Sequence, residues 1–269
     1  MRIVEWQGGD TDILNDLCLH PDDPDAMRRV MCPYVDQRMA WLRRMAPSGL
    51  WVAIAFPSDG RKAGLIECVP IRLAAEPVEG GGGMFINCLW VLRQFSGRGV
   101  GSALLEYALD KAKPDCSVSV LAYEGDRWFG YFSYMPARFF RRFGFAEVDR
   151  DGSRVLLHRG PGGEPIPRLM TPRSRTPEPS QTGLPVVEVL TSSQCPWAGW
   201  MYHRVVEGLR KLPVEVRVVS TDDPDVVREY GLTRGVCVNG YPLVRRMASG
   251  REVVRKVKEY LGVGAREGI

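Results

Sequence analysis

The feature that most constrains this chain is a glycine-rich stretch, residues 96–102, that joins a predicted strand to a predicted helix. An apolar run over 84–92 precedes it and predicts a buried strand, and residues 103–112 after it have helical spacing. Glycines occupy alternate positions of the stretch, although each glycine costs backbone entropy on folding. At such a junction the first N–H groups of the helix have no intrahelical partner and lie at the positive end of the helix dipole. The stretch therefore predicts either a backbone cradle for a phosphate group or a purely structural turn.

Two better-known phosphate loops do not fit this stretch. A Walker loop requires Lys followed by Ser or Thr after its last glycine, whereas Gly101 is followed by Ser102 and Ala103. A dinucleotide fingerprint follows the first strand of a Rossmann unit, whereas this loop lies about ninety residues into the chain, behind several predicted strands. The stretch therefore indicates a different kind of phosphate loop.

The loop and a second motif resemble those of the GCN5-related N-acetyltransferases, the GNAT superfamily. The pyrophosphate loop of that family has the pattern Gln/Arg-x-x-Gly-x-Gly/Ala. It fits in two registers, beginning at Gln94 or at Ser96, and we prefer the second because it aligns the start of the helix. The second motif, 139–145, resembles the signature Phe-Tyr-x-x-x-Gly-Phe, with Phe140 in place of the tyrosine. The resemblance implies an α/β GNAT fold over residues 1–160, with a mixed, mostly antiparallel central sheet and flanking helices.

The resemblance also implies acetyl-CoA as co-substrate and an amine as acetyl acceptor. Backbone amides between Gly97 and Ser102 would meet the pyrophosphate, and Arg98 would add positive charge. In the family, two central strands separate so that a backbone N–H meets the thioester carbonyl, and residues 88–92 would do so here. The residues expected at the cofactor are Leu92, Gly97, Arg98, Gly99, Val100, Gly101, Ser102 and Phe140. The identity of the acceptor and the oligomeric state stay open.

The family's usual acid for the departing thiolate is absent. Its position is taken by Phe140, which has no proton to give. Tyr131 and Tyr134, in an aromatic segment just upstream, are candidate substitutes, and the alternative is that they serve packing.

Two acidic side chains are candidates for the base that deprotonates the acceptor, and one amide side chain is a candidate for orienting the substrate. Glu67 lies in an otherwise apolar strand, where burial can raise a carboxyl group's affinity for protons, so it is the first candidate base. The alternative is a carboxylate that faces solvent by strand alternation. Glu124, at a strand end, is a second candidate base. Asn87 is a candidate for orienting the substrate, or it pairs with backbone.

Composition excludes several other classes of protein. The length of 269 residues suggests two domains, and 45% hydrophobic content suffices for folded cores. No signal-peptide core or membrane-length apolar run occurs, so we expect a cytoplasmic protein without membrane contact. Seven scattered cysteines without a Cys-x-x-Cys pair predict neither a disulfide framework nor a metal site. The net charge of +4 shows no basic run with aromatics, so nucleic-acid binding is not indicated.

The pattern of elements divides the chain in three. Before the loop we expect a strand over 1–6, helices over 12–19 and 24–45, a hairpin of strands 50–56 and 63–71, and a flexible glycine loop over 75–83. After it we expect a strand over 116–123 and a helix over 135–145. Prolines then dominate 161–184, an extended linker that either separates two units or lies along one of them.

Residues 185–269 predict a second, thioredoxin-like α/β domain. Strands at 185–190 and 215–220, a hairpin over 235–246 and helices to about 212, over 223–230 and over 250–261 give the order β-α-β-α-β-β-α, which resembles thioredoxin. Cys195 follows the first strand, but Ala198 replaces the second cysteine, and 233–236 lacks the expected cis-proline. An acetyltransferase domain followed by such a unit is similar to the YoaP-like acetyltransferases over nearly the whole chain.

These features lead to one functional hypothesis and two alternatives. The hypothesis is an acetyl-CoA-dependent N-acetyltransferase whose second domain shapes acceptor recognition. In the first alternative, the chain is a thiol-redox or mixed-disulfide protein that uses Cys195, because a helix N-terminus can lower a cysteine's pKa. Cys237 would then be a resolving partner or a buried packing residue. In the second, the chain is a non-catalytic adaptor that only binds acyl-CoA. A relic thiol in a recognition module is the structural alternative for Cys195.

Overall fold

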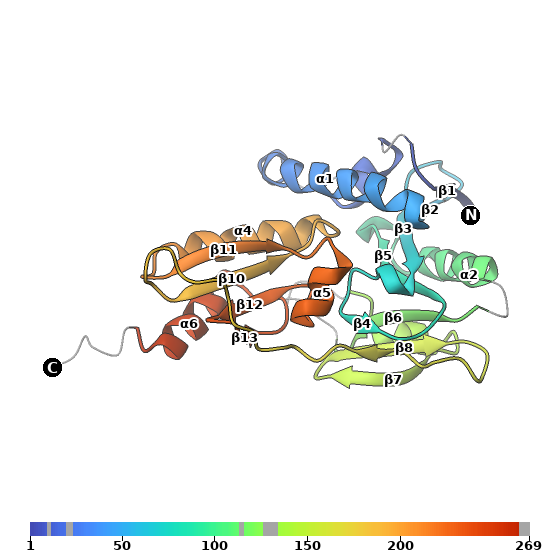
Figure 1. Ribbon diagram of the computed structural model, residues 1–269. Coiled ribbons are helices and arrows are strands. Elements are labelled where there is room, and N and C mark those ends of the chain that lie inside the picture. Colours follow the sequence, from blue (N-terminus) through green and yellow to red (C-terminus); the bar gives the residue numbers. More distant parts are fainter. Residues whose placement is uncertain (10–11, 20–23, 113–115, 126–133, 264–269) are drawn as a thin grey trace. The chain divides into compact units, whose positions relative to one another are not determined.

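The chain folds into two units, Met1–Leu169 and Met170–Ile269, each around its own sheet (Figure 1). The computed structural model describes residues 1–9, 12–19, 24–112, 116–125 and 134–263. The sequence places the domain boundary inside the proline-rich stretch, and the structure divides the chain after Leu169.

The first unit is built on a seven-stranded, mostly antiparallel sheet. Its strand order is β1-β2-β3-β5-β6-β8-β7, and β5 and β6 run parallel. The continuous apolar runs of β2 and β3 are buried along almost their whole length. The strands are β1 (Arg2–Trp6), β2 (Trp51–Phe56), β3 (Gly64–Pro70), β5 (Met84–Val91), β6 (Val118–Tyr123), β7 (Ala146–Asp151) and β8 (Arg154–Arg159).

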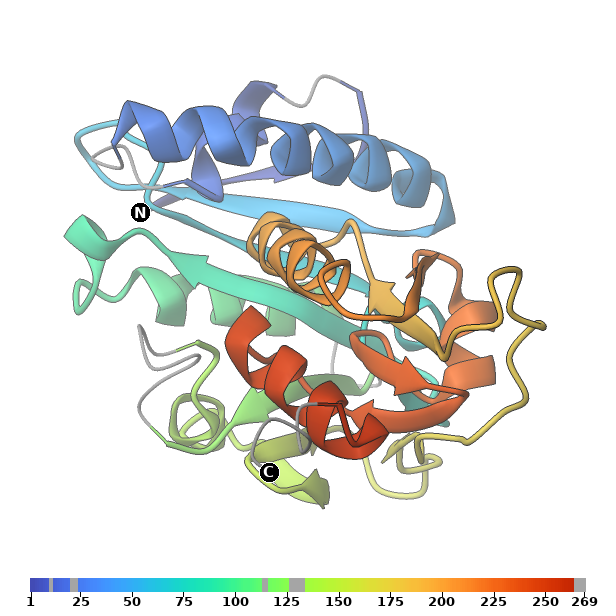
Figure 2. The same ribbon diagram turned by 90° about the vertical axis from the view of Figure 1, so that its left-hand side faces the viewer.

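Helices cover both faces of this sheet. The long helix α1 (Asp25–Met45) and helix α2 (Val100–Ala112) lie on opposite faces, as Figure 2 shows. Met31, Val35 and Leu42 belong to the buried stripe of α1. The remaining helical elements are the short helix α3 (Ala137–Arg141) and the 3₁₀ turns Asp12–Leu17, Ala46–Ser48, Ile71–Leu73 and Arg93–Phe95.

The predicted elements of the first unit are largely confirmed, but the helix predicted over 12–19 is a 3₁₀ turn, Asp12–Leu17, and three other elements differ. Helix α2 begins at Val100, three residues earlier than predicted, so that part of the glycine stretch is already helical. The helix predicted over 135–145 is limited to Ala137–Arg141. The hairpin of β7 and β8 was not predicted, because β7 is an edge strand whose sequence is mainly charged and has no apolar alternation.

The segment 75–83, with its four consecutive glycines, is held in place by pairing and hydrogen bonds, contrary to the expectation of a flexible loop. Strand β4 (Val78–Glu79), within it, pairs with β9 (Arg168–Leu169). At its end, Gly83 accepts a hydrogen bond from Ile71, and a Cβ on Gly83 would lie 1.9 Å from the carbonyl oxygen of Ser117. Only glycine fits this close approach of two backbones.

The second unit has the predicted order of elements. Its sheet has the order β11-β10-β12-β13, in which β10 and β11 are parallel and the other pairs antiparallel. Asp223 caps the second helix and Ser249 the third, and Asn239 and Gly240 turn the hairpin. The elements are β10 (Val186–Thr191), α4 (Pro196–Leu209), β11 (Glu215–Ser220), α5 (Pro224–Tyr230), β12 (Gly235–Val238), β13 (Tyr241–Val244) and α6 (Gly250–Leu261).

The later part of the proline-rich segment lies along the second unit, which was one of the two alternatives for it. Residues 170–183, here called the strap, hydrogen-bond to the second unit throughout: Arg173 N–H donates to Tyr230 O (3.0 Å) and Arg175 N–H to Gly240 O (3.1 Å). Further along, Ser180 and Thr182 donate to the carboxylate of Glu215. These hydrogen bonds, together with one from Arg217, lower the pKa of Glu215 to about 2.

Candidate active site

The central feature of the first unit is the place where β5 and β6 stop pairing, here called the wedge. The two parallel strands pair only over Met84–Ile86 and Val118–Val120, although β5 continues to Val91 and β6 to Tyr123. A β-bulge lies where they part: Cys68 pairs with Ile86 and Glu67 with Cys88, so Asn87 is the extra residue. Because a bulge bends its strand, it directs β5 away from β6. The backbone of residues 88–91 therefore lines an edge that β6 does not pair.

The glycine-rich stretch 96–102, here called the glycine loop, follows the end of β5, beyond the wedge. Gly97 and Gly99 have φ angles of 75° and 76°, a conformation that favours glycine, and a Cβ at either position would meet nothing within 4 Å. Arg98 N–H donates to Phe95 O and Ala103 N–H to Gly99 O. Within the described chain, no hydrogen bond uses the N–H groups of Gly97, Gly99, Val100, Gly101 and Ser102. The loop thus presents a set of amide donors of the kind that binds phosphate.

The start of α2 faces the wedge through Gly101. A Cβ on this glycine would lie 3.6 Å from both Phe139 and Val91. Phe140, predicted at the cofactor, is instead fully buried and packs edge-on against Phe139 and Phe145. Successive residues of a helix point about 100° apart, so only one of the two phenylalanines can face α2. Phe139 is therefore the phenylalanine beside Gly101, and a contact of Phe140 with the cofactor stays a prediction.

Two other residues predicted at the cofactor, Leu92 and Arg98, differ in the groups that they can bring to a ligand. Leu92 is buried and its N–H donates to Ala63 O at 2.9 Å, so this amide is already used. Arg98 is exposed beside the ring of Phe95. Hydrogen bonds from Arg61 lower the pKa of Asp59 first of all, and the charge of Arg98 adds to this effect. Arg98 therefore brings a cation to the loop, whereas Leu92 offers no spare amide.

Glu67 is buried, as the hypothesis of a base in an apolar strand requires, and the alternative of a solvent-facing carboxylate is wrong. It has 0% exposure, and its Oε2 lies 2.6 Å from Nη2 of Arg38 on α1, itself only 2% exposed. A carboxylate in the interior requires such a partner. Arg38 was missed from the sequence, although it occupies a position on the buried stripe of α1 between Val35 and Leu42. The pair lies next to the bulge, because Glu67 is opposite Cys88.

Asn87 pairs with backbone and keeps its donor group buried. Its Oδ1 accepts the N–H of Ala75 at 3.0 Å, which fixes the orientation of the amide because a backbone N–H can only donate. Its Nδ2 is buried without a hydrogen-bond partner in the described chain, and the residue is 4% exposed. The bulge therefore holds a fixed donor where the strands part.

The remaining candidates lie near the end of β6. The ring of Tyr134 is 5.9 Å from that of Tyr123, the last residue of the strand, whereas Tyr131 lies outside the described residues. Glu124 is partly exposed and pairs with Arg141 at 2.7 Å and Arg150 at 3.3 Å. The hydrogen bond from Arg141, more than that from Arg150, lowers the pKa of Glu124. Both arginines thus favour the ionised form of this surface carboxylate.

The two cysteines considered in the second unit have different environments. Cys195 is half-exposed at the N-cap of α4. Cys237 is fully buried on β12, and burial raises the pKa of its thiol to about 12. At neutral pH Cys237 is therefore a protonated, enclosed thiol, which does not suit a resolving cysteine.

Neither a metal centre nor a membrane helix is found in the part of the chain that the structure describes. No three His, Cys, Asp or Glu side chains there come together as metal ligands would. Among the same residues, no helix combines the length and the apolar character needed to cross a bilayer.

Comparisons with known proteins identify the first unit. Residues 12–145 match the model of the acetyltransferase (GNAT) family. The chain therefore contains a GNAT acetyltransferase domain, which defines it as an N-acetyltransferase whose family uses acetyl-CoA. No curated protein matches the chain.

Several solved structures are similar to part of this chain. One is the histone acetyltransferase HPA2 and related acetyltransferase from Corynebacterium glutamicum, at 17% identity and a TM-score of 0.43, covering 60% of this chain and 98% of that one. Another is the PaiA N-acetyltransferase from Thermoplasma acidophilum in complex with coenzyme A, at 15% identity and a TM-score of 0.40, covering 60% and 99%.

If the glycine loop holds the pyrophosphate, Gly99→Asp should weaken acetyl-CoA binding by more than about tenfold. The added carboxylate repels phosphate, and losing a hydrogen bond to a charged group costs roughly 1.5 to 3 kcal/mol. Calorimetry of the folded variant measures this effect. Gly152→Asp is the matched control, because Gly152 also has positive φ and open space, in the turn between β7 and β8. Equal affinities of Gly99→Asp and Gly152→Asp would contradict the assignment.

Proposed function

We propose that the first unit binds acetyl-CoA along the glycine loop and the wedge, and transfers the acetyl group to an amine. The observation that carries this proposal is the set of unused amides of Gly97 and residues 99–102, beyond the end of a strand that separates from its neighbour. Acetyl-CoA supplies the activated thioester. The loop amides and Arg98 hold the pyrophosphate, and the start of α2, with Gly101 and Phe139, adjoins the pantetheine arm.

The bulge would hold the reacting carbonyl. The backbone N–H groups of residues 88–91 that point away from β3, and the Nδ2 of Asn87, are donors fixed before the ligand arrives. Donors that need no reorganisation stabilise the negative charge that develops on a carbonyl oxygen under attack. We propose that these groups together form the oxyanion site.

Glu67 would take the proton that the amine must lose. Its carboxylate lies next to the bulge, and Arg38 supplies the positive charge that keeps a buried carboxylate tolerable. At the leaving-group side, Tyr134, whose ring lies beside that of Tyr123 at the end of β6, would donate a proton to the thiolate in place of Phe140. The proton balance then closes: one leaves the amine toward Glu67 and one reaches the sulfur.

The second unit would serve recognition of the acceptor. Its element order and its strand order β11-β10-β12-β13 support the likeness to thioredoxin and to the YoaP-like acetyltransferases. The lone Cys195 and the enclosed Cys237 do not support a two-cysteine redox cycle. Half-exposed Trp197 and Trp200 near Cys195 offer aromatic contact area to an acceptor.

A screen of amines and peptides with acetyl-CoA, read as release of free thiol, tests the function. Transfer predicts thiol release that depends on the amine and a product carrying one acetyl group. A protein that binds CoA but releases none with any amine would be the acyl-CoA adaptor. Turnover of a disulfide reporter that disappears in Cys195→Ala would instead identify the thiol function.

The fragment 1–169 should bind acetyl-CoA with nearly the affinity of the full chain. All proposed cofactor residues lie in the first unit, which has its own core and includes strand β9. Calorimetry of both proteins compares the affinities, and acceptor KM should rise in the fragment. If the fragment folds but no longer binds acetyl-CoA, the two units must build the cofactor site jointly.

A further inference from the structure

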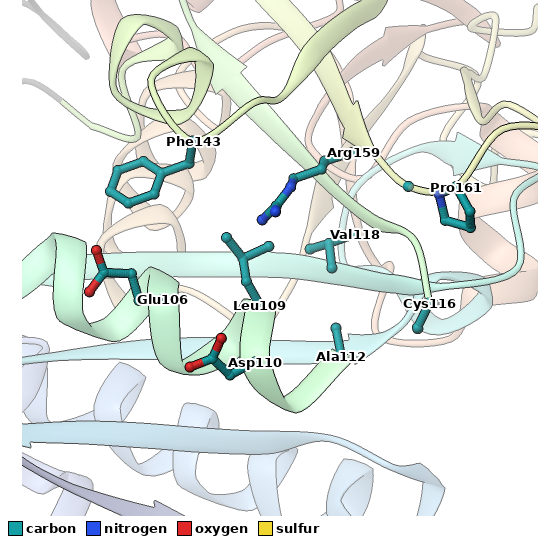
Figure 3. Close-up of a pocket in the computed structure, with 10 residues that line it drawn as sticks. Glu106, Leu109, Asp110, Ala112, Cys116, Val118, Phe143, Arg159 and Pro161 are labelled. Atoms are coloured by element: carbon teal, nitrogen blue, oxygen red, sulfur yellow. The ribbon is translucent and has the colours of Figure 1, made fainter. Parts of the chain in front are cut away.

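An unassigned pocket of about 820 Å³ lies in the first unit, on the side of the sheet that α2 covers (Figure 3). Its walls come from the second half of α2, the start of β6, Phe143 after α3, and the end of β8. Val118 of the pocket pairs with Met84, so the pocket adjoins the closed end of the wedge, whereas the glycine loop follows the other end of β5. Its volume is typical of small-molecule sites.

The charged groups of this pocket are separated by sign. Glu106 and Asp110 are one turn apart on α2 and line one wall. Arg159, the last residue of β8, enters from the opposite wall, and in Figure 3 its guanidinium reaches between Phe143 and Leu109. Apolar side chains, among them Leu109, Val118 and Phe143, make up much of the remaining lining, and in Figure 3 Leu109 lies between Arg159 and Asp110.

None of the three charged side chains has an ion pair or hydrogen bond with another described residue. Nearby arginines behave differently: Arg141 pairs with Glu124 and Glu147, and Arg154 with Asp151. A guanidinium laid over apolar side chains, without a carboxylate partner, can take a ligand carboxylate through two parallel hydrogen bonds. The acidic wall can take an ammonium group in the same way.

We propose that this pocket binds a small zwitterion whose ammonium and carboxylate groups lie at opposite ends of an apolar body, as in a dipeptide or an ω-amino acid. The carboxylate pairs with Arg159, the ammonium with Glu106 and Asp110, and the body covers Leu109 and Val118. An anion alone would meet two carboxylates, and a cation alone would meet the guanidinium. The zwitterion is the ligand class that satisfies both walls.

Calorimetry with probes of matched length tests this inference independently of acetyl transfer. The zwitterions are ε-aminocaproate and dialanine, and the single-charge probes are hexylamine and hexanoate. The wild-type chain should bind a zwitterion about tenfold more tightly than either single-charge probe, a difference of about 1.4 kcal/mol. In Arg159→Gln, the zwitterions should bind no more tightly than hexylamine. In the double variant Glu106→Gln, Asp110→Asn, they should bind no more tightly than hexanoate.

Arg168→Gln is the matched control, because Arg168 is also exposed in the first unit but lies outside the pocket. It should bind every probe like the wild type. All three charged residues are exposed, so their variants should keep the wild-type melting temperature. The inference is overturned if neither zwitterion binds more tightly than the single-charge probes, or if Arg159→Gln keeps the preference.

Discussion

Glu67→Gln should lower both the stability of the first unit and its acetyl transfer. The substitution removes the carboxylate that lies 2.6 Å from the buried Arg38 guanidinium, and breaking a buried ion pair costs about 3 to 5 kcal/mol. That is a large part of the roughly 5 to 15 kcal/mol that holds a domain together. Loss of a general base should slow transfer by about 10² to 10⁴-fold. Denaturant unfolding and steady-state kinetics at a temperature where the variant is folded measure the two effects.

A double variant separates the two roles of Glu67. Arg38→Met together with Glu67→Leu replaces the ion pair by apolar side chains of similar size, which often restores or exceeds the original stability. If Glu67 is the base, this variant should be stable and still inactive, with unchanged affinity for acetyl-CoA. A double variant that is stable and transfers acetyl at the wild-type rate would reduce Glu67 to a structural partner of Arg38.

Arg175→Ala should destabilise the second unit by about 3 to 5 kcal/mol, again because it leaves a buried charge without its partner. Arg175 reaches from the strap to Glu188 on the central strand β10, with 2.8 Å between Nη1 and Oε1. Glu188 is 4% exposed, and its Oε1 also accepts from Tyr230 OH. The guanidinium stacks over the ring of Tyr230 and pairs with Glu229 at 2.7 Å. Its removal thus affects strap, strand and helix α5 together.

Hydrogen exchange of the β10 and β12 amides in the full chain measures this loss in the second unit alone. Arg173→Ala is the matched control on the same strap, because Arg173 is exposed and contributes a backbone hydrogen bond that alanine keeps. It should change the free energy by less than about 0.5 kcal/mol. If Arg175→Ala changes exchange no more than Arg173→Ala, the strap is not held by its buried ion pair.

Local patterns were sufficient to predict most of both folds. Uniform apolar runs gave β2, β3 and β5, and the pair Asn239 and Gly240 gave the turn of the second hairpin. The glycine stretch indicated a phosphate loop, and the structure leaves its amides unused. These features depend on neighbours in the sequence, which is why they can be read from it.

Features that depend on distant residues could not be predicted in the same way. Whether Glu67 faced solvent or the interior depended on α1, which covers that face and carries Arg38. Which phenylalanine of 139–145 faces α2 depended on the packing of α3. Strand β9 and the strap contact residues far away in the sequence, so composition alone suggested a linker.

Amide hydrogen exchange with and without acetyl-CoA tests the central claim most directly, that the glycine loop and the wedge form the acetyl-CoA site. The account predicts slower exchange, on adding acetyl-CoA, at Gly97, at 99–102 and along the β6-facing edge of 88–91, where amides now lack partners. The turn at Gly152 should not change. Protection confined to the second unit, or bound acetyl-CoA that leaves 97–102 unprotected, would contradict the account.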